Sequence, residues 1–198
     1  AQFCHLPSFP KMEQTSSRPI LTIEQTWLDN QPIVVKRSTF GRGNIVPHRL
    51  AFHKFTYVLK GRGRIVSACG STHVREGTAI LARPLVWHAY PRQQSTWNVV
   101  EVMFDGGALV SSPGNTIQSI QELKQLIETR DPDPEQAPPL TLSLKQPLRE
   151  TVAQNMLRLF QLSRQPWSDR LLWLQQARLA MILFDALLEN ESETSLID

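Results

Sequence analysis

The chain changes its hydrophobic period once, and this change constrains its fold more than any other feature of the sequence. Between Ile20 and Phe104, short runs of β-branched and aromatic residues alternate with turn residues, a pattern typical of β-strands. After Asp105-Gly106-Gly107, apolar residues recur about every 3.6 positions, which is the period of an amphipathic helix. We therefore predict an α+β fold with an antiparallel barrel over residues 20–107 and helices over residues 115–190.

Strand-like runs and glycine-bearing breaks follow one another in the first part. We predict strands at residues 33–40, 52–59, 64–68, 78–82 and 97–104. We predict turns at the breaks 41–44, 61–63, 69–71 and 75–77, because each contains a glycine that adopts backbone conformations other residues resist. Residues 1–19 are rich in proline and serine and have no periodicity, so we expect a flexible arm there.

The second part is predicted to form helices. The first covers about residues 115–127, and the four prolines within 131–139 end it in a solvated loop. Two longer helices follow at about residues 148–162 and 168–188, the last of them opening at Ser168. Because only a short connection separates these two, we predict an antiparallel helical hairpin.

The last helix carries more apolar residues than packing against one neighbour requires. We expect part of this surplus to contact a second subunit, which predicts a homodimer. The residues assigned to that contact are Leu172, Leu179, Ile182, Leu183 and Leu187. In the alternative, one apolar stripe packs on the barrel and the other on the preceding helix.

Composition narrows the classes of protein to which the chain can belong. Its 198 residues are 41% hydrophobic and contain no apolar run long enough to span a bilayer, so we expect a cytoplasmic protein that is not membrane-bound. Residues 1–105 carry a net charge of +7 and the remainder −4. The positive residues are scattered singly, which favours a solvated basic surface over a nucleic-acid site. Cys4 and Cys69 lack metal-ligand spacing and are expected to be free thiols.

The histidines of the first part are poor candidates for a metal centre. If His48 points into a barrel, the alternation of a strand places Leu50 and Lys54 on the same side and His53 on the other. A leucine has no lone pair to offer, and an ammonium group repels a divalent cation. We therefore predict no metal and no other cofactor.

The spacing of several motifs is similar to that of a known family. These motifs are His48-Arg49-Leu50, the turn Tyr57-Val58-Leu59-Lys60-Gly61-Arg62-Gly63, Gly77, and His88-Ala89-Tyr90. Together they resemble the cupin signature, and more specifically the amino-terminal sensor domain of AraC/XylS-family transcription regulators. Leu50 and Lys54 depart from the signature at the positions where cupin enzymes have a histidine and a glutamate.

The resemblance implies a jelly-roll barrel followed by a helix and a helical hairpin that contributes to dimerisation. It also implies a small-molecule effector in the barrel, an amino-terminal arm that closes over it, and no enzymatic activity. Residues 191–198 are similar to the start of the linker that leads to a helix-turn-helix domain in this family. The 198 residues contain no helix-turn-helix domain, so we expect DNA to be bound only through such a domain and not by these residues themselves.

An effector site can be predicted from the alternation of the strand at residues 97–104. The resemblance implies that Glu101, with Val99 and Met103, faces the barrel, beside Lys54 and His88. The two charged groups then either neutralise one another or await a polar ligand such as a sugar. The predicted ligand-binding residues are His48, Lys54, Trp87, His88, Tyr90, Trp97 and Glu101.

Two other interpretations stay open. One is a stand-alone cupin metalloenzyme, of isomerase or dioxygenase type, with a metal at His48 and His88. The other is a dimerisation module whose barrel is filled by its own side chains.

Overall fold

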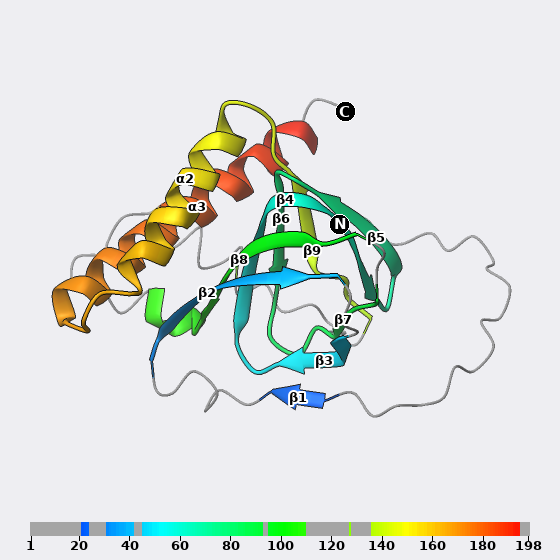
Figure 1. Ribbon diagram of the computed structural model, residues 1–198, viewed down its shortest axis with the longest axis horizontal. Coiled ribbons are helices and arrows are strands. Elements are labelled where there is room, and N and C mark those ends of the chain that lie inside the picture. The colour runs from blue at the N-terminus through cyan, green and yellow to red at the C-terminus, as the bar shows by residue number, and fades with distance from the viewer. Residues whose placement is uncertain are drawn as a thin grey trace, which may run out of the picture.

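The computed structural model describes residues 21–23, 31–41, 45–92, 95–109, 127 and 136–194. These residues form a β-barrel with a pair of helices packed against one of its faces (Figure 1). The strands are β1 (Leu21–Ile23), β2 (Ile33–Phe40), β3 (Ile45–Leu50), β4 (His53–Ser67), β5 (Gly70–Arg75), β6 (Thr78–Ala82), β7 (His88–Tyr90), β8 (Trp97–Phe104) and β9 (Leu140–Ser143). The helices are a 3-10 turn at Gly106–Leu109, α2 (Leu148–Leu162) and α3 (Asp169–Thr194).

Strand β4 belongs to both walls of the barrel. Its first half pairs with β8 and β6 in a wall completed by β2 and β9, and its second half pairs with β5 and β7 in a wall completed by β3 and β1. All pairings are antiparallel except that of β1 with β3. A strand of 15 residues therefore holds the two walls together.

The break predicted at residues 61–63 is wrong, because β4 continues through it. The pairing with β8 shifts between Val58 and Lys60, so that Leu59 is an extra residue and forms a β-bulge. Gly61 follows the bulge with φ +91°, a conformation that residues with a Cβ atom rarely adopt. Before the bulge the even-numbered residues face the interior, and after it the odd-numbered residues do, since Val58 pairs with Val99 and Gly61 pairs with Trp97.

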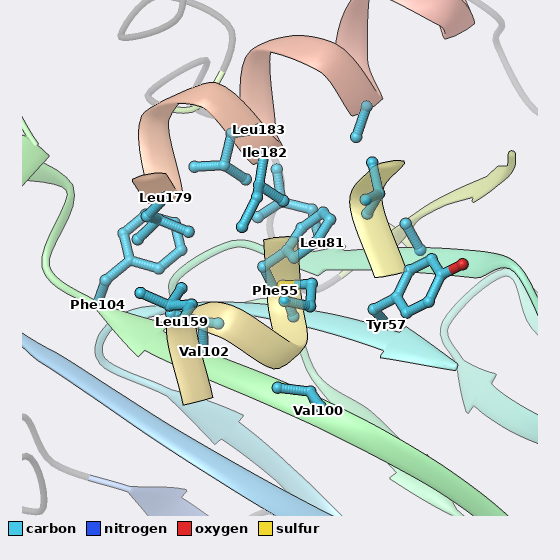
Figure 2. Packing of buried hydrophobic residues seen from close by; sticks show 14 of the residues in the cluster. Phe55, Tyr57, Leu81, Val100, Val102, Phe104, Leu159, Leu179, Ile182 and Leu183 are labelled. Carbon is cyan, nitrogen blue, oxygen red and sulfur yellow. The ribbon is translucent and has the colours of Figure 1, made fainter. Parts of the chain in front are cut away.

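The main hydrophobic core lies between the outer face of the β2-β8-β4-β6 wall and the two helices. Figure 2 shows Phe55, Val102 and Phe104 of the sheet pointing toward Leu159 of α2 and Leu183 of α3. These side chains are all fully buried. Their removal from water is the dominant favourable contribution that holds the hairpin on the barrel.

Several predicted elements agree with the structure. The bounds of β2, β6, β8 and α2 are those expected from the sequence. Residues 140–143, by contrast, lie in the segment predicted as helical and form β9, since Leu140 and Leu142 alternate with polar residues in the period of a strand. The predicted arm at residues 1–19 lies outside the described residues, as does the predicted helix at 115–127 apart from the buried, helical Ile127.

The hairpin is formed as predicted, but α3 is longer. The Ser168 hydroxyl accepts a hydrogen bond of 3.2 Å from the Leu171 amide and so caps the helix at its start. The helix continues to Thr194, so the first half of the predicted linker is helical, and residues 195–198 lie outside the described part. No helix among the described residues is long and apolar enough to cross a membrane.

The residues assigned to a subunit contact need a correction. Leu179, Ile182, Leu183 and Leu187 are buried in the chain's own core, and Leu172 is half-buried. The four buried residues belong to the core formed with α2 and the barrel, as the alternative interpretation of the apolar surplus expected. These four are therefore not available to a second chain, whereas the assignment of Leu172 stays a prediction.

Candidate functional site

Two facing walls of the barrel bring a group of polar side chains into its interior. His48 of β3 and His88 and Tyr90 of β7 come from one wall, and Lys54 of β4 and Glu101 of β8 come from the other. Each of these residues is less than a tenth exposed. Residues distant in the sequence thus meet in one enclosed polar cluster, which is uncommon inside a small barrel.

Lys54 lies at the centre of this cluster. Its ammonium group donates a 2.9 Å hydrogen bond to the Tyr90 hydroxyl, and its Nζ is 3.7 Å from Oε1 of Glu101. The other carboxylate oxygen, Oε2 of Glu101, accepts a 2.8 Å hydrogen bond from the Ser38 hydroxyl on β2. Glu101 therefore faces Lys54, as the family resemblance implied for this side of β8.

The electrostatics keep Lys54 charged in spite of its burial. Burial alone favours the neutral amine, but the Tyr90 oxygen and the Glu101 carboxylate outweigh it, so the pKa of Lys54 is raised. Burial raises the pKa of the Tyr90 hydroxyl, which stays protonated at neutral pH. A buried ion pair of this kind costs desolvation energy and is weak support for stability, which points to a role other than stability.

The two histidines form a pair whose protonation can be assigned. His48 and His88 are directly opposite one another on β3 and β7, and their ring centroids are 4.4 Å apart. The Nδ1 atoms lie 3.1 Å and 3.3 Å from the carbonyl oxygens of Val46 and Val86. A carbonyl only accepts, so each Nδ1 carries the proton and donates it.

Both rings are neutral at physiological pH. Burial, together with the nearby Lys54 charge, lowers the pKa of His48 and lowers that of His88 well below its usual value. With Nδ1 protonated, each Nε2 carries a lone pair. The pair thus offers hydrogen-bond acceptors to the interior.

An aromatic wall adjoins the polar cluster. The rings of Phe40 and Tyr90 are stacked at 4.7 Å, and Trp97 lies 5.1 Å from Phe40 and 5.8 Å from Tyr90. The Trp97 indole lies directly over the backbone of β4 at Gly63, where a Cβ atom would come within 2.5 Å of the ring. Glycine at position 63 is therefore required for the observed position of Trp97.

Some buried polar atoms of the interior have no hydrogen-bond partner among the described residues. They are Nε2 of His88, which is an acceptor, and Nε1 of Trp97, which is a donor. A buried polar atom left unpaired costs about 1–3 kcal/mol, so both atoms need a polar partner that the described residues do not supply.

One predicted site residue is not part of the cluster, and others were missed. Trp87 is half-buried, and no ring contact or hydrogen bond found in the described chain joins it to the rest. Ser38, Phe40 and Thr56 belong to the interior but were not predicted. The alternation of β2 places Ser38 and Phe40 on one face, although nothing in the sequence identified that face as the inner one.

The cluster does not fit a metal ion. The described residues contain no group of three or more histidine, cysteine or acidic side chains able to hold one. His48 and His88 supply two imidazole lone pairs, but the Lys54 charge acts on both rings and disfavours a second cation. The donor set therefore disagrees with the metal chemistry of the cupin enzymes that the sequence resembles.

His53 lies outside this cluster and gives the chain a predicted pH dependence. Its Nε2 donates a 3.3 Å hydrogen bond to the Ile127 carbonyl, its ring stacks on Phe104, and burial lowers its pKa to about 4. The unfolded chain takes up this proton near pH 6.5, whereas the folded chain does not. Stability from this group is thus complete above pH 6.5 and is lost as the pH falls toward 4.

The variant His53→Gln removes the titrating group. Between pH 7.5 and pH 5, its free energy of unfolding is therefore expected to fall by about 2 kcal/mol less than that of the wild-type chain. Urea unfolding at the two pH values measures the difference. His48 and His88 titrate in both proteins and cancel in the comparison. Equal losses in the two proteins would show that His53 titrates normally.

Comparison with known proteins shows the fold. No protein-family model matches the sequence, and no curated protein matches it. Among solved structures, an apo ToxT variant from Vibrio cholerae has a TM-score of 0.53 and 8% identity, and the match covers 83% of this chain and 57% of that one. A cupin 2 conserved barrel domain protein from Leptotrichia buccalis matches at a TM-score of 0.35 and 16% identity, over 37% of this chain and 36% of that one, which is too weak for argument.

The chain spans little more than half the length of the ToxT structure that it matches. At this identity the likeness concerns the fold and not the activity. It agrees with the element order described above and with the fold class expected from the sequence. The described chain is a cupin-like antiparallel β-barrel followed by a helical hairpin.

Proposed function

We propose that this chain is the effector-sensing and dimerisation domain of an AraC-type transcription regulator, without enzymatic activity of its own. A small polar molecule binds inside the barrel, and the signal passes to a helix-turn-helix domain outside these 198 residues. The fold shared with ToxT, an AraC-type regulator, supports the assignment to regulators. The observation that carries the effector part is the pair of unpartnered buried polar atoms, Nε2 of His88 and Nε1 of Trp97, whose rings both contact Tyr90.

The chemistry of the interior favours a ligand rich in hydroxyl groups. A hydroxyl can donate to Nε2 of His88 and accept from Nε1 of Trp97, and both atoms are without a partner in the described chain. The rings of Phe40, Tyr90 and Trp97 line the interior, and a sugar ring can pack its C–H side against this aromatic wall once the barrel opens. We therefore propose a monosaccharide or polyol as the effector class.

Binding requires the barrel to open. The cluster is almost completely buried, so a ligand reaches it only through a movement at the barrel mouth. To signal, the ligand has to favour one arrangement over the other by about 1–3 kcal/mol.

A thermal-shift screen of monosaccharides and polyols tests this proposal. We expect at least one of them to raise the midpoint of unfolding in a concentration-dependent way. The double variant Lys54→Met/Glu101→Leu, which keeps side-chain volume and removes both buried charges, is expected to abolish the shift. The variant Glu76→Leu/Arg149→Met removes an ion pair at the surface and should keep it. Full affinity in the first variant would show that the polar cluster is not the binding site.

An exposed apolar stripe on α3 supports dimerisation. Trp173, Leu174 and Met181 are 52%, 37% and 57% exposed and lie on the face of α3 that points away from the core. If two copies of α3 pack antiparallel, centred near Ala177, Arg170 of each copy faces Asp185 of the other. A second copy of this chain is therefore the proposed partner of the stripe.

The variant Met181→Glu is expected to weaken the dimer at least about 10-fold, because it places a charge within the apolar contact, opposite Leu174 of the other copy. Sedimentation equilibrium measures the dissociation constant. Leu85→Glu adds the same charge at an exposed leucine of the barrel and should leave the dimer unchanged. A wild-type chain that is monomeric, or equal effects of the two substitutions, would contradict this assignment.

The competing enzyme hypothesis is favoured by one observation. The backbone carbonyls that hold Nδ1 of His48 and His88 also orient their Nε2 atoms, as in many metal sites. Elemental analysis of the purified chain distinguishes the two functions. About one transition-metal ion per chain, lost in His88→Ala, would favour the metalloenzyme over the sensor.

A further inference from the structure

A basic groove lies on the outer surface of the barrel, apart from the polar interior. Two adjoining hollows of about 810 Å³ and 1060 Å³ share Arg62, Arg75, Ser95 and Ser143 in their linings. Lys60 and Arg149 line the first hollow, and Arg92 and His73 line the second. Positive residues that are scattered through the sequence are therefore gathered on one face by the fold.

The positive charge of this groove is largely uncompensated. Glu76 is the acidic residue in the lining of the two hollows, and it pairs with Arg149. The side chains of Lys60, Arg62, Arg75 and Arg92 form no ion pair with the acidic groups that the structure describes. A concave surface with charge of one sign concentrates the field and attracts anions.

The arrangement of the charges opposes stability. Arg62 and Arg75 are directly opposite one another on β4 and β5. Like charges in directly opposite positions of an antiparallel pair are destabilising. On the same strands, Ile65 and Val74 turn inward to the core, so Arg62 and Arg75 both lie on the outer face. This arrangement favours a binding role over a structural one.

The lining of the groove indicates the kind of anion. Among the described residues it contains no phenylalanine, tyrosine or tryptophan, and its apolar residues, Val74 and Leu144, are buried. A nucleotide or an unpaired base stacks on a broad apolar or aromatic surface, and the described lining offers only the imidazole ring of His73. Exposed arginine and lysine with Ser95 and Thr96 hydroxyls are instead the side chains that contact phosphate oxygens.

We propose that this groove binds the phosphate backbone of double-stranded DNA without reading its sequence. It forms a contact of the barrel itself, in addition to any made by a helix-turn-helix domain. The choice of DNA over other polyanions rests on the proposed function, because a regulator holds its barrel close to the duplex. Two adjoining hollows with several separate charges suit an extended ligand better than a single small anion.

Fluorescence anisotropy with a 30-base-pair duplex of random sequence tests the inference on the 198-residue chain. With about four phosphates contacted, binding should weaken about 100-fold between 50 and 200 mM salt, with a log–log slope near −3.5. The variant Arg62→Ser/Arg75→Ser/Arg92→Ser is expected to bind at least about 10-fold more weakly at 50 mM salt and to reduce the slope to near −1. Its thermal midpoint should not fall, since these side chains are exposed.

A matched variant distinguishes the loss of charge within the groove from a general decrease in the net charge of the chain. Arg37→Ser/Arg158→Ser/Arg164→Ser removes the same charge from exposed positions outside the groove and should keep both affinity and slope. Equal losses in the two triple variants, or no binding of the wild-type chain at 50 mM salt, would overturn the inference. Competition by tripolyphosphate as strong as that by the duplex would replace it with a small-anion site.

The outcomes also distinguish this inference from the proposed function. A chain that binds a polyol and dimerises but does not bind duplex DNA refutes the groove alone. A chain whose groove binds the duplex while no polyol shifts its unfolding refutes the effector site and leaves the groove standing.

Discussion

Replacing Glu101 by alanine is expected to lower the free energy of unfolding by about 3–5 kcal/mol at neutral pH. The substitution leaves the Lys54 ammonium group buried without its carboxylate, which lies 3.7 Å away in the wild-type chain. It also removes the acceptor of the Ser38 hydroxyl. Urea unfolding followed by circular dichroism measures the loss.

The double variant Lys54→Met/Glu101→Leu distinguishes the effect on stability of losing the ion pair from the effect of leaving one charge buried and unpaired. Replacing both partners by apolar side chains of similar volume removes the desolvation cost together with the attraction, so we expect stability within about 1 kcal/mol of wild type or above it. A double variant as unstable as Glu101→Ala would mean that the pair itself stabilises the barrel. In that case the polar interior would need no ligand to account for it.

Gly61→Ala is expected to lower the free energy of unfolding by about 2–5 kcal/mol, as the sum of two effects. Alanine at φ +91° is strained by about 1–2 kcal/mol. Its Cβ atom would also lie 2.5 Å from the Thr96 carbonyl oxygen, and relieving such an overlap costs about 1–3 kcal/mol. The measurement is again chemical denaturation, with the thermal midpoint as a second readout.

Gly70→Ala is the matched control for this second substitution. Gly70 also has a positive φ, at +103°, but a Cβ atom there meets nothing within 4 Å. Only the strain of about 1–2 kcal/mol is therefore expected. If the two alanine variants are equally destabilised, the close approach of β8 at Gly61 has no energetic role.

The sequence was most informative where one pattern continues over a whole element. Strands β2, β6 and β8 are runs of β-branched and apolar residues bounded by turn residues, and helix α2 has a period of about 3.6, so their bounds were predictable. The meeting of Lys54 and Glu101 followed from alternation along β8, once the resemblance to a known family indicated which face is inner.

Features that depend on tertiary contacts were not predictable in the same way. The glycines of residues 61–63 have the composition of a turn, yet they lie within β4 because β8 pairs along it. Apolar residues cover so much of α3 that the sequence did not show which side of the helix faces the core. The buried Leu179 and Ile182 were therefore assigned to a subunit contact. The basic groove was missed because its charges come from strands and a helix start that are separate in the sequence.

The regular alternation of β4 on either side of its bulge makes the length of that strand more restrictive than its composition. Deleting a paired residue such as Arg62 would exchange the two faces of the strand beyond it, turning Arg64 toward the barrel and Ile65 toward solvent. Deleting the extra residue Leu59 would leave both faces unchanged. Insertions at the exposed turn around Cys69, by contrast, change no alternation. Among homologous chains, we therefore expect substitutions throughout this strand, but gaps only at the bulge and at its distal turn.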